Sequence, residues 1–459
     1  MPSSRRPIMV VAGTRPEAIK IASVIWWLNR LGVDYVFVWS GQHYDYEMSR
    51  IFFEQLNLPE PGEYLDIGAQ AQGVEHQVAL LIKGITNVAK KREPKLIYSL
   101  GDTNTTLAAA LTSVYLAKPF IHDEAGMRSF DNTMLEEINR RVADAVATFR
   151  LAPTKIAVLN LLYEGVPSFT IRLVGSTLVD VLLYVVSHKL LKEDVFSEYR
   201  ILPSQYVLFT VHRRENLTEE RLKNIISILT GVARRLSEYK IVFPVHPHTR
   251  KYLEELGLVK VLSSHDNILM IKPLGYLEFI TLLKNARAVV TDSGGVQEEA
   301  FILGKRTVTL RNITEWPETV VLGYNKLLNP DDVDKAVSTI AKSVELPELS
   351  PPQLSECPLG DGNAGRRVAK LLQLLSETGI ERNVGTVKAK GYPLPRLKVG
   401  SDHLALCFEK GLPIVQEELR YGSSSNVCVL RDDLADEEIL KIIKVDWTKI
   451  DELLMRVEL

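Results

Sequence analysis

Cysteine is scarce in this sequence and thinly spread. Its three residues, Cys357, Cys407 and Cys428, are too few and too far apart for a disulfide framework. No C-x-x-C pair and no His/Cys cluster has the spacing of a metal site. We therefore expect a protein of the reducing cytoplasm that needs no metal and no other cofactor.

Long apolar runs and a surplus of one charge are also absent. No stretch approaches the roughly 20 apolar residues of a membrane span, and the run after Arg5 and Arg6 breaks at Gly13, too early for a secretory leader. The 55 Lys and Arg nearly balance the 57 Asp and Glu, for a formal charge of −2. Because a nucleic-acid surface needs a basic surplus, we expect neither nucleic acid nor membrane as a partner, and any anion site must be local.

What the sequence does contain is a regular alternation of short β-rich runs with longer stretches of helical period. The first series runs from PIMVVAG to AVATFRLAPT, and the second, after GSTLVDVLLYVVSHKLL, from QYVLFTVHR to RTVTLR. This pattern predicts the α/β class with doubly wound parallel sheets. We expect two Rossmann-like domains, at 1–182 and 183–362, then one helix at 363–380.

The last part of the chain, 381–459, loses the alternation and carries no recognisable motif. Its final stretch, LADEEILKIIKVDWTKIDELLMRVEL, is amphipathic and predicts a helix. We assign no role to this extension.

Polar groups that follow the strands indicate where a ligand binds, because ligands of open parallel sheets gather at the carboxyl ends of strands. After Gly13, a helix start with Arg15 and Lys20 suits a phosphate. The alternative is a capped helix with a surface ion pair.

The stretch AVVTDSGGVQEEAFILG predicts a second anion site. A strand ends at Asp292, Ser293–Gly295 let a ligand approach the backbone, and a helix begins near Gln297. A nucleotide diphosphate would fit there, with Glu298 or Glu299 accepting from ribose hydroxyls. A plain turn before an acidic helix is the alternative.

Two histidine clusters follow successive strands of the second domain. VHRREN supplies His212, Arg213 and Arg214, and PVHPHTR supplies His246, His248 and Arg250. A single histidine is more often structural, but two clusters at neighbouring strand ends favour anion binding.

Carboxylates are concentrated between residues 102 and 141. Asp102, Asp123 and Glu124 follow strands, whereas Glu136 and Arg140 lie one turn apart on a predicted helix. We expect Ile138, Val142 and Ala145 to form the buried stripe of that helix, and Glu137 to form a solvated bridge with Arg141. Carboxylates beside cations in one cleft suggest acid/base chemistry on an anionic substrate.

Nine ordered motifs between about residues 8 and 378 together resemble the non-hydrolysing UDP-N-acetylglucosamine 2-epimerases. They are GTRPEAIK, SGQH, GDTNTT, EAGMRSF with EEINRR, APT, GSTLVD, VHRREN, DSGGVQEEA and TEWPE. The resemblance implies two Rossmann-like domains facing across a cleft (GT-B-like), a final helix returning to the first domain, a cytoplasmic homodimer and a role in cell-surface polysaccharide synthesis. Trp26 and Trp27 fit either a core or a dimer interface.

The implied reaction interconverts UDP-GlcNAc and UDP-ManNAc. The C2 proton is not acidic, so the family first eliminates UDP to 2-acetamidoglucal and then adds UDP back with inversion at C2. The resemblance assigns the catalytic positions to Asp102, Glu124, Glu136 and His212. Together with the strand-end patterns it assigns substrate binding to Arg15, Lys20, Arg140, Arg213, His246, Ser293, Gly294, Gly295 and Glu299.

Departures from the family pattern qualify the resemblance. Gln42 and His43 match positions that regulate substrate-activated bacterial members, but LDIGAQAQ lacks the Arg that accompanies them. The retained GTRPEAIK favours the non-hydrolysing branch over hydrolysing relatives that release ManNAc and UDP. A 2-epimerase of a UDP-diacetamido-uronic acid, a GT-B glycosyltransferase and a catalytically inactive nucleotide-sugar sensor remain alternatives. Because every motif precedes residue 380, we expect a chain that ends there to keep its activity.

Overall fold

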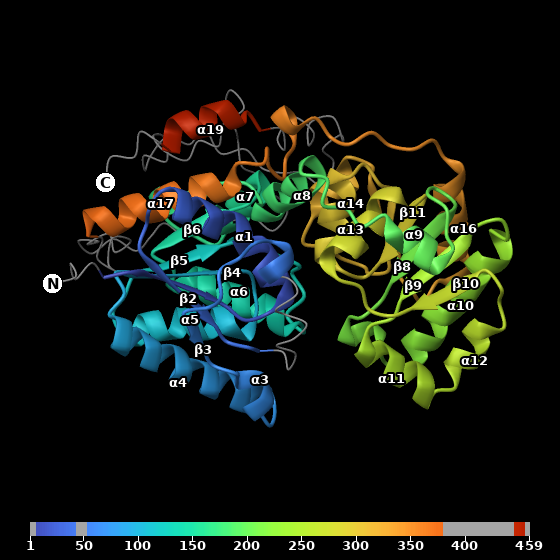
Figure 1. Ribbon diagram of the computed structural model, residues 1–459, viewed down its shortest axis with the longest axis horizontal. Helices are drawn as coiled ribbons and strands as arrows, with labels where there is room; N and C mark the ends of the chain where they lie inside the picture. Colours follow the sequence, from blue (N-terminus) through green and yellow to red (C-terminus); the bar gives the residue numbers. More distant parts are fainter. Residues whose placement is uncertain (1–5, 43–52, 380–444, 455–459) are drawn as a thin grey trace, which may run out of the picture. The chain divides into compact units, whose positions relative to one another are not determined.

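The computed structural model describes residues 6–42, 53–379 and 445–454 (Figure 1). The chain divides into two compact units. Unit 1 comprises residues 1–181 and 354–459, and unit 2 comprises residues 182–353. Helix α8 (Thr177–Ser187) carries the chain from the first unit into the second.

Unit 1 is built on a seven-stranded parallel sheet with the strand order β3-β2-β1-β4-β5-β6-β7. The direction of the order reverses between β1 and β4, which is where a doubly wound sheet binds ligands. Its strands are β1 (Ile8–Ala12), β2 (Tyr35–Trp39), β3 (Glu63–Tyr64), β4 (Leu96–Leu100), β5 (Phe120–Asp123), β6 (Phe149–Ala152) and β7 (Ile171–Leu173).

Helices cover both faces of this sheet (Figure 1). They are α1 (Arg15–Arg30), α3 (Ile67–Gln70), α4 (Val74–Arg92), α5 (Asn104–Tyr115), α6 (Leu135–Val146), α7 (Lys155–Tyr163) and α17 (Ala364–Thr378). All residues of β1 and β4 are buried, as their continuous apolar runs predict for a parallel sheet. One core joins Met9 and Val11 of β1 to Ile85 of α4 and Ala109 of α5.

Helix α17 returns the chain to unit 1 and packs closely on α1. A Cβ atom at Gly365 would lie 2.4 Å from Ser23 Oγ, so only glycine permits this approach. The buried Asp180 accepts hydrogen bonds from the Ala364 and Gly365 amides at 3.0 and 2.7 Å, which fixes the first turn of α17. Helix α19 (Trp447–Leu454) then packs on α17 (Figure 1).

Unit 2 contains a six-stranded parallel sheet of order β10-β9-β8-β11-β12-β13, which reverses between β8 and β11. The strands are β8 (Tyr206–Thr210), β9 (Lys240–Pro244), β10 (Ile268–Ile271), β11 (Ala288–Thr291), β12 (Thr307–Thr309) and β13 (Asn325–Leu327). The helices are α9 (Asp194–Tyr199), α10 (Glu219–Arg235), α11 (Pro247–Glu255), α12 (Leu258–Ser263), α13 (Tyr276–Asn285), α14 (Gly294–Ile302), α15 (Pro317–Val321) and α16 (Val333–Glu345). Its core lies between the sheet and helices that include α10 and α16.

The two parallel sheets confirm the predicted α/β class, and every strand inferred from the alternation is present. Three short strands, β3, β7 and β13, were not predicted. The helix after Asp292 begins at Gly294 rather than near Gln297. Of the predicted C-terminal helix, only residues 445–454 are described, and α19 lies within them. No helix in the described ranges is long and apolar enough to cross a membrane.

Candidate functional site

The loop after β1 is held by a buried glutamate that belongs to the first turn of α1. Glu17 Oε2 accepts the Gly13 and Thr14 amides at 2.9 and 2.8 Å, which forms a capping box with Thr14. Its Oε1 accepts the Thr103 hydroxyl of the β4–α5 loop at 2.7 Å. Burial raises the pKa of Glu17, although these hydrogen bonds oppose the shift. Glu17 thus joins the two loops that meet at the switch point of unit 1, a role that we did not predict.

Lys20 and Glu124 come from different elements and form an ion pair in this region. Lys20 Nζ on α1 lies 2.5 Å from Glu124 Oε1, which directly follows β5. Both side chains are largely buried. Glu124 has a φ of +59°, a left-handed conformation that is uncommon outside glycine and concentrates at functional sites.

Asp102 is held from α6 by two side chains. Arg140 Nη2 pairs with its carboxylate, and Asn139 Nδ2 donates to its carbonyl oxygen at 3.0 Å. The Asp102 side chain keeps 33% of its surface exposed, whereas that of Arg140 keeps 4%. The Asp102 carboxylate is therefore accessible to solvent, whereas the guanidinium of Arg140 is buried.

The loop that carries Asp102 is in contact with the side chain of Glu124. A Cβ atom at Gly101, the residue before Asp102, would lie 3.4 Å from Glu124 Oε2. Unit 1 therefore brings together Lys20, Glu124, Asp102 and Arg140.

The buried face of α6 is polar, which corrects the predicted apolar stripe. Ile138 is 42% exposed and Ala145 is exposed, and Val142 is half-buried. The buried positions are instead Glu137, Asn139, Arg140, Ala143 and Asp144. Helical spacing predicted one buried apolar stripe. The loops that carry Asp102 and Gly126 instead present polar groups to this helix, and the buried charged residues Arg140 and Asp144 bind them.

Glu137 is fully buried, so its bridge to Arg141 is not the solvated pair that we expected. Its carboxylate accepts the Ser129 amide at 2.9 Å and the Ser129 hydroxyl at 3.0 Å, as well as Arg141 Nε at 3.0 Å. Glu136, its neighbour, is exposed on the first turn of α6.

Two further predicted positions of unit 1, Arg15 and Gln42, lie near the same edge. Arg15, the first residue of α1, is half-buried. Gln42 Oε1 accepts the amide and the hydroxyl of Thr105 at 3.0 and 2.8 Å, and so ties the loop after β2 to α5. His43 lies outside the described residues.

Asp123 precedes Glu124 and is buried. Its carboxylate accepts the Tyr98 hydroxyl at 2.6 Å and the Glu124 amide at 2.8 Å. Burial raises the pKa of Asp123 to about 6, although both hydrogen bonds oppose the shift. Asp123 therefore supports the backbone of Glu124 from within the sheet.

In unit 2, Asp292 organises the loop that carries the predicted catalytic histidine. The fully buried carboxylate accepts the His212 amide at 3.1 Å and the Arg213 amide at 2.9 Å, and His212 Nδ1 lies 3.6 Å away. The loop is thereby fixed at the switch point between β8 and β11. The side chain of His212 remains 43% exposed.

His246 begins α11 and lies beside His212. The centroids of the two rings are 6.2 Å apart, and both side chains are exposed. His246 Nδ1 accepts the His248 amide at 3.3 Å, so it also caps its helix. Arg250, from the same motif, forms a surface pair with Glu254.

The first turn of α14 leaves Ser293, Gly294 and Gly295 partly exposed, whereas the following residues of the helix are buried. A Cβ atom at Gly295 would meet nothing within 4 Å, so the space beside this glycine is open. Such a helix start binds anions through its backbone amides. Glu299 is buried one turn later, and burial together with this carboxylate raises the pKa of Tyr276 well above its usual range.

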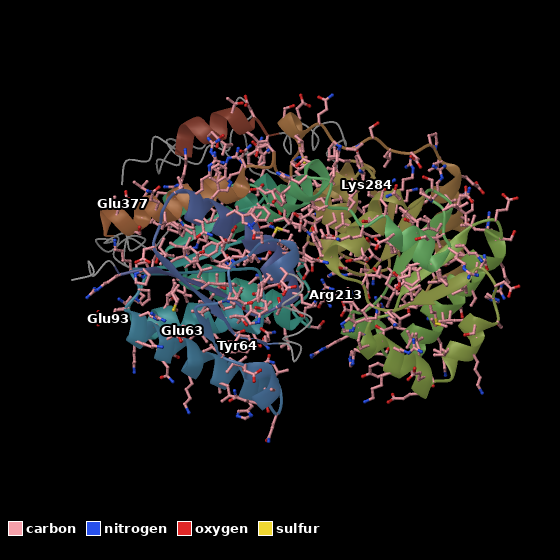
Figure 2. The ribbon with its side chains drawn as sticks, viewed as in Figure 1. Glu63, Tyr64, Glu93, Arg213, Lys284 and Glu377 are labelled. Carbon is pink, nitrogen blue, oxygen red and sulfur yellow. The ribbon has the colours of Figure 1, made fainter. Side chains whose placement is uncertain are left out.

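Two partners of this region were not predicted. Arg311 and Glu315 form a buried pair at 2.8 Å, and Glu315 also lies 3.8 Å from Arg213, which is labelled in Figure 2. A Cβ atom at Gly294 would lie 3.7 Å from Arg213 Nη2, so the arginine reaches the start of α14. A buried arginine in RNITEWPE gives no periodic signal that would have distinguished it from a surface charge.

Within the part of the chain that the structure describes, no group of three or more His, Cys, Asp or Glu side chains could hold a metal ion. The basic side chains found beside these loops are those of Lys, Arg and His. Unit 1 therefore offers acid/base groups, and unit 2 offers anion-binding groups.

Comparisons with known proteins agree with this arrangement. The profile of the family described as UDP-N-acetylglucosamine 2-epimerase matches residues 28–373. The UDP-N-acetylglucosamine 2-epimerase of Methanocaldococcus jannaschii is 40% identical over 368 residues, which cover 80% of this chain and 98% of that protein. The UDP-2,3-diacetamido-2,3-dideoxy-D-glucuronate 2-epimerase of Pseudomonas aeruginosa is 36% identical over 376 residues, covering 80% of this chain and 99% of that one.

Solved structures show the same likeness. The M. jannaschii UDP-GlcNAc 2-epimerase in complex with UDP-GlcNAc and UDP matches with a TM-score of 0.73 at 39% identity, over 80% of this chain and 99% of that chain. The Neisseria meningitidis enzyme bound to UDP-GlcNAc matches with a TM-score of 0.71 at 30% identity, over 80% and 100%. The fold is therefore GT-B-like, with two Rossmann-like units.

The chain belongs to the UDP-N-acetylglucosamine 2-epimerase family. The resemblance to this family seen in the nine motifs is confirmed. As a member of the family, the protein is an epimerase of nucleotide sugars.

Proposed function

We propose that this protein is the non-hydrolysing type of UDP-GlcNAc 2-epimerase and interconverts UDP-GlcNAc and UDP-ManNAc. The observation that carries the proposal is the pair of cation-supported carboxylates in unit 1, Asp102 with Arg140 and Glu124 with Lys20. Inversion at C2 needs one group that removes a proton from one face of the sugar and another that delivers it to the opposite face.

The reaction begins with elimination. The bond between C1 and the β-phosphate oxygen breaks, its electron pair leaves with UDP, and a carboxylate takes the C2 proton, so that 2-acetamidoglucal forms. We assign proton transfer to Asp102 and to Glu124 or Glu136. In the second half, a proton is delivered to the opposite face of C2 and UDP adds back to C1.

UDP is held by unit 2 in this proposal. Ser293 and the amides of Gly294 and Gly295 take the diphosphate, Glu299 takes the ribose hydroxyls, and His212, Arg213 and His246 meet the charge of the departing UDP. Fixed donors aimed at a developing negative charge stabilise the transition state without reorganisation. In unit 1 we assign phosphate or nucleotide binding to Arg15 and Lys20, with Arg140 in support. We further propose a cytoplasmic homodimer.

A relative that acts on a diacetamido-uronate nucleotide supplies the second candidate function, because its identity of 36% lies close to that of the UDP-GlcNAc epimerases. The two candidates differ at C3 and C6 of the sugar, where the uronate carries an acetamido group and a carboxylate. Side-by-side turnover of both UDP-sugars distinguishes them.

Chromatography of the nucleotides tests the proposal. Purified protein is incubated with UDP-GlcNAc alone, without metal or acceptor. We expect UDP-ManNAc to accumulate to a constant ratio with the substrate. Stoichiometric free ManNAc and UDP would instead assign the hydrolysing reaction, and turnover of only the uronate would assign the second candidate.

A further inference from the structure

His122 is a buried histidine for which the proposed reaction has no use. It lies on β5, two residues before Glu124, and has no exposed surface. Its ring stacks on Phe120, with centroids 5.9 Å apart and planes at 15°. Because this imidazole is buried close to Asp102 and Glu124, its hydrogen-bond partners bear on how those carboxylates are held.

Both ring nitrogens of His122 face acceptors. Nδ1 lies 2.7 Å from Asp144 Oδ1, and Nε2 lies 2.8 Å from the carbonyl oxygen of Gly101. A carbonyl oxygen only accepts, so Nε2 must carry a hydrogen.

Asp144 also acts as an acceptor toward every partner it has here. Its second oxygen accepts the Gly126 amide at 3.0 Å and pairs with Arg128 at 2.7 Å. Burial alone would raise the pKa of Asp144, but His122 and Arg128 outweigh burial and lower it. The Asp144 carboxylate therefore links the ring of His122 to the Gly126 amide and to Arg128.

His122 and Asp144 together hold the backbone next to the two carboxylates of the proposed reaction. His122 holds the carbonyl of Gly101, which directly precedes Asp102, and Asp144 holds the amide of Gly126, two residues after Glu124. Gly101 and Glu124 both have left-handed φ angles, +79° and +59°. Such conformations persist only where the surroundings over-determine them.

We propose that His122 is a positioning residue: its buried ring, held by Asp144, fixes the backbone that sets Asp102 beside Glu124. This inference rests on the proposed function, because it gives His122 a part in that reaction. The charged groups around the ring are Asp144, Arg128 and, on the neighbouring strand β6, Arg150, while Asp123 adjoins it on β5.

Two amide substitutions separate the two contacts. In His122→Asn the amide nitrogen takes the place of Nδ1, keeping the contact with Asp144 and losing that with Gly101. In His122→Gln the longer side chain reaches the place of Nε2, keeping the Gly101 contact. We expect the Asn variant to lose about 10²-fold in kcat with an unchanged KM, because misplacement of about 1 Å costs that much, and the Gln variant to stay within a few-fold of the parent.

A purely structural histidine predicts the opposite pattern. Both variants would then change together, in proportion to their loss of melting temperature, and equal losses in the two would overturn the proposal. Binding of UDP, assigned to unit 2, serves as a control that neither substitution should alter.

NMR of the full chain with ¹⁵N-labelled histidine tests the ring without reference to turnover. The signal that disappears in His122→Gln among the nine histidines belongs to His122. We expect Nε2 at the shift of a ring nitrogen that carries a hydrogen, and the backbone amide of Asp102 displaced in the Asn variant but not in the Gln variant.

A ring without a hydrogen on Nε2, or an Asp102 amide that both variants displace equally, would overturn the inference. If the parent protein failed to turn over UDP-GlcNAc while Nε2 carried its hydrogen and the Asp102 amide followed the expected pattern, the proposed function would fail and the positioning role of His122 would stand.

Discussion

At the scale of single residues, adjacent identical side chains do different work. Glu136 is exposed at the start of α6, whereas Glu137 is fully buried and holds the backbone of Ser129. The sequence EEINRR does not reveal which glutamate turns inward, because that depends on the loop that packs against the helix. The resemblance nevertheless selected Glu136 for catalysis, and its exposure is consistent with contact to a substrate.

The two glutamates form a matched pair for mutation. We expect Glu137→Gln to lower the free energy of unfolding by about 3 kcal/mol, because it breaks a buried charge network that includes Arg140 and Arg141. Glu136→Gln should leave stability unchanged and reduce turnover. Urea unfolding followed by circular dichroism, with turnover measured in parallel, would refute this division if the two variants behaved alike.

Asp102 should be needed for chemistry but not for nucleotide binding. We expect Asp102→Asn to reduce kcat by at least about 10²-fold, the usual contribution of a proton-transfer group, and to keep UDP affinity, since UDP is assigned to unit 2. Asp334→Asn, an exposed position at the start of α16, is the control. Turnover of Asp102→Asn near that of the control would remove Asp102 from the mechanism.

At the scale of helices and strands, the sequence predicted what periodicity and turn residues report. Most of the long strands end at, or within two residues of, a Gly, Asp or Pro, so their ends and the polar residues beyond them could be placed. Strands of two or three residues, such as β3 and β13, are too short for a periodic signal. The prediction of the buried face of α6 was wrong because the burial of charged side chains depends on partners that are distant in the chain.

The pairing of α8 with α17 has a measurable pH dependence. Burial raises the pKa of Asp180 to about 7, from a usual value near 4, although the amides of α17 oppose the shift. Between these values the folded state binds more protons than the unfolded state, so stability falls as pH rises from about 4 to about 7. We expect Asp180→Asn to flatten the dependence of unfolding free energy on pH in this window. An unchanged slope in the variant would show that another group causes it.

At the scale of the whole molecule, the chain carries more than its relatives do. The family match ends at residue 373, and relatives matched over 98% or more of their own length cover 80% of this chain. Helix α19 lies in the additional part. Its buried Trp447 donates from Nε1 to the Cys357 carbonyl at 2.9 Å and stacks under Arg367, with the guanidinium 4.7 Å from the ring. The extension therefore contributes to the packing of unit 1, which no motif predicted.

Removal of this contact should cost stability more than activity. We expect Trp447→Ala to destabilise unit 1 by about 3 to 5 kcal/mol, the usual loss for a buried tryptophan, and to leave kcat within a few-fold. The neighbouring exposed Thr448→Ala is the control. Thermal unfolding would refute this account if both variants melted with the parent. A chain ending at residue 380 should show the same loss of stability while remaining active.

If the C2 proton leaves during elimination of UDP, proton NMR in D₂O will detect its replacement by deuterium. Purified protein is mixed with UDP-GlcNAc without metal or acceptor, and the C1 and C2 proton signals of the nucleotide sugars are followed. We expect UDP-ManNAc with deuterium at C2. UDP-ManNAc that retains the C2 proton of the substrate would exclude the proposed elimination.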